Sequence, residues 1–120
     1  MTYVTKGLVA MIIIILVDIP WLTIQMSPSQ KMFSEIQGGR PVRMTLWAAI
    51  IVYIALAYLL LLQTSMSGAF LSGAAVYAVY EFTNMAVFKD YSLGFAVADT
   101  LWGGVLFAIA YVLMKQIFPQ

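Results

Sequence analysis

Three carboxyl side chains stand inside stretches of sequence that are otherwise apolar enough to lie in lipid. Asp18 follows MIIIILV, Glu81 lies within AVYEFTNMAVF, and Asp99 lies within FAVADTLWGG. Carboxyl groups in such places bind cations, relay protons or act as general acids and bases. Because each acidic residue near the centre of a spanning helix costs about 2.5–3.5 kcal/mol on insertion, three of them together indicate a functional site.

Helical spacing brings further polar and aromatic side chains beside each carboxyl. Residues three or four apart share one face of a helix, so Asp18 lies beside Trp21 and Gln25, and Asp99 lies beside Trp102. A third face carries Tyr77, Glu81, Asn84 and Phe88. At about 1.5 Å of rise per residue, the three carboxyls fall in the same half of the membrane. The pattern predicts one polar pocket walled by aromatic rings.

A second interpretation stays open for each of these groups. Polar side chains in membrane bundles often hydrogen-bond one helix to the next without binding anything else. Tyrosine and tryptophan residues, taken singly, are common as packing residues or as anchors at the membrane interface. The spacing alone does not choose between a ligand site and interhelical hydrogen bonds.

The composition indicates an integral membrane protein. Hydrophobic residues make up 63% of the 120 residues and charged residues only 9%, and the apolar residues come in long runs. The net charge of +1 and the lack of a basic stripe make nucleic acid an improbable partner. The sequence holds neither cysteine nor histidine, so any chemistry must use carboxyl, hydroxyl, amide and amine groups.

Four apolar runs are each close to the roughly 20 residues that cross the hydrocarbon core. They cover about residues 7–26, 44–62, 69–88 and 94–118. The turns at 63–68 and 89–92 are short, which favours antiparallel neighbours. We therefore predict an all-α membrane protein: a four-transmembrane-helix antiparallel bundle that forms a single domain over residues 1–120.

The connection between the first two runs, residues 27–43, is long and charged. Ser27 and Gln30 have capping-box spacing, Pro28 suits a first helical turn, and Gly38 and Gly39 favour a stop. These signals predict a short interfacial helix over about 28–37. Its apolar face would carry Met32, Phe33 and Ile36, which we expect to point toward lipid.

The distribution of basic residues predicts the orientation. One side of the predicted bundle carries Lys31, Arg40, Arg43 and Lys89, and the other carries Lys6 and Lys115. Cytoplasmic loops hold an excess of lysine and arginine. We therefore expect a multi-pass protein with the long loop in the cytoplasm and both termini on the non-cytoplasmic side; the sequence does not identify the membrane.

Two local patterns predict which helices pack together. The tetrapeptides DIPW (18–21) and DTLW (99–102) share D-x-x-W, which favours pairing of the first and fourth helices. Small residues at four-residue spacing let helix backbones approach closely. Such rows are Ala96, Thr100, Gly104 and Ala108 on the fourth helix, and Gly68 with Ser72 and Ala69 with Gly73 on the third. Tight packing of the third and fourth helices is therefore expected.

The stretch YEFTNMAVFKDYSLGFAVADTLWGGVL closely resembles a family pattern, in which Y-D-x-T-N is followed by a hydrophobic stretch and D-x-x-W-G. The family comprises small bacterial membrane proteins filed as domain of unknown function 2177, and DIPWL is similar to its early D-x-x-W-L. Glu81 stands where the family usually has aspartate. The resemblance implies a four-helix membrane protein with the signature Asp18, Trp21, Tyr80, Glu81, Thr83, Asn84, Asp99 and Trp102.

The candidate ligand-binding residues are Asp18, Trp21, Tyr77, Tyr80, Glu81, Asn84, Asp99 and Trp102. Glu81 and Asp99 are expected to face the bundle interior near each other. Like charges at close range require a shared proton, a bound cation, or a basic partner such as Arg40 or Arg43. No motif identifies a metal, a cofactor or a catalytic residue.

Three classes of function fit this pocket. The first is a membrane site for a cation, a proton or a small polar or lipid ligand. The second is a lipid-modifying enzyme, for which no specific catalytic motif is present. The third is an accessory or assembly subunit of a larger membrane complex. The expected partner is the lipid bilayer, with a homo-oligomer or larger complex left open.

Overall fold

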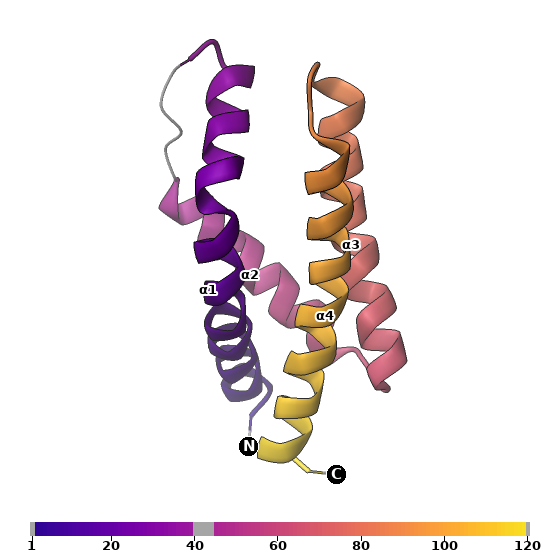
Figure 1. The fold of residues 1–120 in the computed structure, drawn as a ribbon. Helices are drawn as coiled ribbons and strands as arrows, with labels where there is room; N and C mark the ends of the chain where they lie inside the picture. The colour runs from indigo at the N-terminus through magenta and orange to yellow at the C-terminus, as the bar shows by residue number, and fades with distance from the viewer. Residues whose placement is uncertain (1, 40–44, 120) are drawn as a thin grey trace.

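The computed structural model describes residues 2–39 and 45–119, and over these residues the chain forms four α-helices. They are α1 (Tyr3–Ile36), α2 (Leu46–Leu61), α3 (Met66–Val87) and α4 (Leu93–Ile117). α1 and α3 run in one direction and α4 runs back, so both chain ends lie at one end of an elongated molecule (Figure 1). We call this the termini end, and we call the opposite end, with the α3–α4 turn, the turn end.

The all-α, four-helix prediction is confirmed by this arrangement. The predicted runs at 44–62, 69–88 and 94–118 match α2, α3 and α4 closely, although residue 44 lies outside the described residues. α1 and α4 are long and apolar enough to cross a membrane, whereas α2 is a shorter apolar helix. Many large apolar side chains on the outside are exposed, among them Ile24, Leu71 and Val79. Outward apolar surface of this kind suits a lipid environment better than water.

Hydroxyl side chains begin three of the four helices. Each accepts a hydrogen bond from a backbone N–H in the first turn, which the helix itself leaves without a partner. The pairs are Thr2 with the N–H of Thr5 (3.2 Å), Ser65 with that of Gly68 (3.0 Å) and Ser92 with that of Phe95 (3.1 Å). These caps set where α1, α3 and α4 start.

α3 and α4 form the most extensive helix pair, and glycines make their close approach possible. A Cβ atom on Gly73 would lie 2.1 Å from the carbonyl oxygen of Gly103, and one on Gly103 would lie 2.6 Å from that of Gly73. A Cβ on Gly104 would meet the ring of Phe70 at 2.7 Å. The predicted tight packing is confirmed. Its closest point is the Gly73–Gly103 contact, and Gly103 was not part of the predicted small-residue rows.

The apolar core lies between the termini end and the middle of the bundle. Ile14 of α1 and Leu106 and Phe107 of α4 are fully buried, and α2 adds Leu56 and Leu60. The core therefore packs α1, α2 and α4 together below the level of Asp18 and Asp99. Asp18, Glu81 and Asp99, the three carboxyls that the sequence predicted at one level, lie together on the turn-end side of this core.

The prediction of a separate interfacial helix over 28–37 is wrong. These residues are helical, but they continue α1, which runs unbroken through Pro20, Ser27 and Pro28 as far as Ile36. α1 is therefore 34 residues long, and Ser27 does not begin a helix. The predicted stop is confirmed, because Gln37 follows the last helical residue and Gly38 and Gly39 both have positive φ.

Tertiary contacts explain why this stretch does not lie apart with its apolar face toward lipid. Phe33 packs edge-on against the Tyr91 ring, with centroids 5.8 Å apart, and the Met32 sulfur accepts a hydrogen bond from the Ser92 N–H at 3.3 Å. Met32 and Ile36 also line a hollow with Val87 and other residues at the end of α3. The last turns of α1 thus cover the α3–α4 turn.

Candidate functional site

The three carboxyl groups singled out in the sequence are all buried and line one cavity. Glu81 is 1% exposed, Asp18 4% and Asp99 8%. The cavity has a volume of about 210 Å³ and extends from the middle of the bundle toward the turn end. Its wall is made of Asp18, Trp21, Leu22, Gln25, Ser29, Phe33, Tyr77, Tyr80, Glu81, Phe95 and Asp99. We call it the acidic cavity.

The two D-x-x-W sequences pair crosswise between α1 and α4. The indole N–H of Trp102 donates to Asp18 Oδ1 at 2.7 Å, and the indole N–H of Trp21 donates to Asp99 Oδ1 at 2.9 Å. Between these hydrogen bonds the two indole rings stack, with centroids 5.6 Å apart and planes 16° from parallel. We call this arrangement the Asp–Trp clasp. It confirms the predicted pairing of the first and fourth helices.

α2 also contacts the site, through a residue that the sequence analysis did not select. The Tyr53 hydroxyl donates to Asp18 Oδ2 at 2.9 Å, so both oxygens of Asp18 accept hydrogen bonds. The signal for Tyr53 was its place in the middle of an otherwise apolar helix. Tyrosines that act as interface anchors sit near helix ends, so a mid-helix tyrosine points to a polar partner.

Glu81 is held by a second missed residue, Tyr91, in the turn between α3 and α4. The Tyr91 hydroxyl donates to Glu81 Oε1, and the side-chain amide of Asn84 donates to the Tyr91 oxygen at 3.4 Å. Burial, the hydrogen bond to Glu81 and the charge of that carboxyl raise the pKa of the Tyr91 phenol. Tyr91 therefore stays protonated and acts as a donor, which fixes the side chain of Glu81.

The hydrogen bonds divide the carboxyls into two kinds. Both oxygens of Asp18 are used by Trp102 and Tyr53, whereas the bonds described above use one oxygen each of Asp99 and Glu81. Glu81 and Asp99 also lie within hydrogen-bonding range of each other, so a proton shared between them or a cationic ligand would engage their remaining oxygens. The Gln25 side-chain oxygen in the cavity wall adds a buried acceptor without a partner among the described residues.

The structure brings the predicted site residues together but not all on one surface. Six of them line the acidic cavity: Asp18, Trp21, Tyr77, Tyr80, Glu81 and Asp99. Asn84 and Trp102 are not among the lining residues; Asn84 donates a hydrogen bond to Tyr91, and Trp102 donates one to Asp18. Arg40 and Arg43, the expected basic partners, lie outside the described residues. Among the residues that line the cavity, none is basic.

Comparison with known families identifies the chain. Residues 3–114 match the family model described as a predicted membrane protein, DUF2177. The chain is a member of the DUF2177 family. No curated protein and no solved structure matches it.

In this DUF2177 member, all but one of the eight residues of the family signature lie at or beside the acidic cavity. Five of the eight line the acidic cavity: Asp18, Trp21, Tyr80, Glu81 and Asp99. Trp102 hydrogen-bonds Asp18, and Asn84 hydrogen-bonds Tyr91, which in turn hydrogen-bonds Glu81. Thr83 is exposed on α3. Apart from Thr83, the residues of the signature therefore gather at one site in three dimensions, around the three buried carboxyls.

Proposed function

We propose that this DUF2177 protein binds a small organic cation, such as a protonated amine, in the acidic cavity. One observation carries the proposal: three buried carboxyl groups line a single cavity, and none of its lining residues is basic. Unpaired negative charge is costly to bury. A positively charged ligand would neutralise it, and a proton shared between carboxyls would do so when the ligand is absent.

The shape of the site favours an organic cation over a metal ion as the ligand. Among the described residues, no three acidic side chains lie close enough to hold one metal ion together. The cavity wall is instead rich in aromatic rings, from Trp21, Phe33, Tyr77, Tyr80 and Phe95. Aromatic faces attract organic cations by about 0.5–2 kcal/mol each. At about 210 Å³, the cavity suits a ligand smaller than the drug-sized molecules of larger sites.

Replacing Glu81 with glutamine tests this proposal. Glutamine keeps the shape and an acceptor for Tyr91 but removes the charge, and loss of a buried charge partner costs about 2 kcal/mol or more. We expect the dissociation constants of methylammonium, guanidinium and tetramethylammonium to rise by about 30-fold or more. Trp21 lies in the cavity wall and stacks on Trp102, so the fluorescence of this pair reports binding in a Trp47→Phe background, in which the exposed indole of α2 is removed.

The matched control is Glu35→Gln, which removes an exposed carboxyl from α1 away from the cavity. It should leave the dissociation constants unchanged. Helicity and the unfolding midpoint of Glu81→Gln should stay close to those of the parent, which separates lost binding from lost structure. If the parent binds none of the three cations, or if both variants weaken binding equally, the proposal is wrong.

We further propose that all four helices cross the membrane, with both termini on the non-cytoplasmic side. The apolar outer surface and the common end of the two termini support this topology (Figure 1). α2 spans about 24 Å at 1.5 Å per residue over its 16 residues, so it would cross in a locally thinned bilayer. The orientation rests on the sequence, in which the long loop of residues 27–43 and the turn at 89–92 together hold more lysine and arginine than the two end segments of the chain.

Cysteine labelling can test the topology cleanly, because the sequence contains no cysteine. Thr64→Cys and Pro119→Cys place exposed thiols at the termini end, and Lys89→Cys places one at the turn end. In intact cells, a membrane-impermeant maleimide should label the first two and not the third. Labelling of Thr64→Cys and Lys89→Cys from the same side would contradict four crossings. The reverse pattern would contradict only the orientation.

A further inference from the structure

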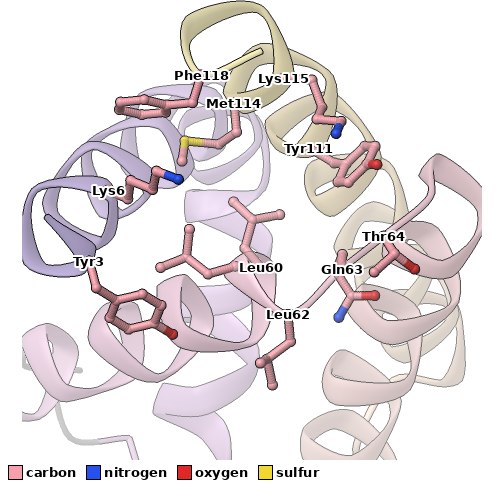
Figure 2. A pocket seen from close by; sticks show the side chains of 11 residues that line it. Tyr3, Lys6, Leu60, Leu62, Gln63, Thr64, Tyr111, Met114, Lys115 and Phe118 are labelled. Carbon is pink, nitrogen blue, oxygen red and sulfur yellow. The ribbon is translucent and has the colours of Figure 1, made fainter. Parts of the chain in front are cut away.

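A second cavity lies at the termini end, and its chemistry is opposite to that of the acidic cavity. It has a volume of about 350 Å³ and lies between the start of α1, the end of α2 and the end of α4. Its polar lining groups are Tyr3, Lys6, Gln63, Thr64, Tyr111 and Lys115 (Figure 2). No residue that lines it is acidic. We call it the basic cavity.

The two ammonium groups of the basic cavity are held by aromatic rings rather than by carboxylates. The Lys6 nitrogen lies 5.7 Å from the centre of the Phe118 ring, and the Lys115 nitrogen lies 6.0 Å from that of Tyr111. In Figure 2 the two lysines approach the cavity from different helices, α1 and α4. A ring contact leaves the N–H donors of an ammonium group available. The cavity therefore offers two positive charges to an anion.

In the topology proposed above, the basic cavity lies at the level of lipid headgroups. Lys6 and Lys115 lie near the ends of α1 and α4, the two helices long and apolar enough to cross a membrane. Lysines near the ends of such helices extend toward the interface. Beside them, Val4, Leu8 and Ile117 are more than half exposed. An acyl chain could lie against these residues while its headgroup enters the cavity.

We propose that the basic cavity binds the phosphate of an anionic lipid headgroup. Lys6 and Lys115 would donate charge-assisted hydrogen bonds to the phosphate oxygens, and the Thr64 hydroxyl would add a neutral donor. The adjacent exposed apolar surface favours a lipid over a soluble phosphate as the source of this group. The site is independent of the acidic cavity, since no residue lines both.

Native mass spectrometry of the detergent-solubilised protein tests this site, with phosphatidylglycerol and phosphatidylcholine as probes. We expect the parent to retain phosphatidylglycerol in preference to phosphatidylcholine. At about 1 kcal/mol for each lysine near an anionic surface, Lys6→Gln or Lys115→Gln should weaken the binding of phosphatidylglycerol about fivefold, and the double variant about 25-fold. Lys115→Arg should restore most of the binding, because it keeps the charge.

The matched control is the pair Lys31→Gln and Lys89→Gln, which removes two lysines from the turn end. It should leave phosphatidylglycerol binding within about twofold of the parent. Equal loss in both pairs, or no preference for phosphatidylglycerol in the parent, would overturn the proposal. A competition arm with millimolar glycerol phosphate identifies the source. If phosphatidylglycerol stays bound, the result supports a lipid headgroup as the ligand of the basic cavity. If glycerol phosphate displaces it completely, the proposal of a lipid ligand is wrong and a soluble phosphate is the ligand.

Discussion

Replacing Gly73 with alanine is expected to lower the free energy of unfolding by about 3 kcal/mol. The new Cβ would lie 2.1 Å from the Gly103 carbonyl oxygen and 2.7 Å from the Phe107 Cβ. Neither neighbour is the end of a flexible side chain, so α3 and α4 would have to separate, and overpacking of this kind costs about 1–3 kcal/mol or more. Reversible unfolding in mixed detergent micelles, followed by circular dichroism, measures the change.

Gly7→Ala is the matched control for this effect. A Cβ on Gly7 would find its nearest neighbour, a Leu61 methyl carbon, at 4.0 Å, which is an ordinary contact. Because alanine is the better helix former by about 1 kcal/mol, this change should be neutral or stabilising. A loss in Gly7→Ala as large as that in Gly73→Ala would contradict the close Gly73–Gly103 contact as the cause.

Replacing Asp18 with alanine is expected to cost about 3 kcal/mol of stability. Asp18 accepts hydrogen bonds from both Trp102 and Tyr53, so its removal leaves two part-buried donors without an acceptor. A donor left unsatisfied costs about 1–3 kcal/mol. The same unfolding assay measures this loss, and the near-ultraviolet circular dichroism of the stacked Trp21 and Trp102 should weaken with it.

Two further variants separate the hydrogen bonds of Asp18 from its charge and from the ring stack. Asp18→Asn keeps the shape and one acceptor oxygen, so it should cost only about 1 kcal/mol. Trp102→Phe keeps an aromatic ring beside Trp21 but removes the indole donor. In a double-mutant cycle, Asp18→Ala and Trp102→Phe should be coupled by at least about 0.5 kcal/mol. Additive effects would show that the Trp102–Asp18 hydrogen bond contributes nothing to the free energy of unfolding.

Much of the candidate site could be predicted because polar residues in an apolar chain are few. Asp18, Glu81 and Asp99 stood out against long apolar runs, and helical spacing put Trp21 and Trp102 beside two of them. Lipid-facing surfaces rarely carry carboxyl groups, so the bundle interior was the expected place. The repeated D-x-x-W correctly predicted which helices would pair, although it did not predict that each aspartate would bond the tryptophan of the other helix.

The residues that prediction missed depend on contacts between distant parts of the chain. Tyr53 and Tyr91 bond carboxyls on other segments, and their neighbours in sequence give no sign of those partners. Gly103 was missed for a related reason. Spacing within α4 identified a row of small residues, whereas the closest point depends on how α3 and α4 are aligned, and that alignment is set by packing along both helices.

The wrong prediction of a separate interfacial helix has a different cause. A serine, proline and glutamine at 27–30 suit the start of a helix, but a long helix tolerates the same residues in its interior. The Ser29 hydroxyl instead donates to the Met26 carbonyl at 3.2 Å, within continuous α1. The contact of Phe33 with Tyr91 then favours a straight continuation over a turn. Local signals could not reveal that contact.

The Asp–Trp clasp limits how the two long helices can move past each other. Its two hydrogen bonds run in opposite senses, from α4 to α1 and from α1 to α4, on either side of a ring stack. Sliding one helix by a turn, about 5.4 Å, would break both bonds and unstack the rings. Rocking about the stacked indoles would keep all three contacts. The clasp therefore acts as a pivot between α1 and α4. A motion that opened the acidic cavity toward the turn end would tilt α1 about this point and would not translate it along its own axis.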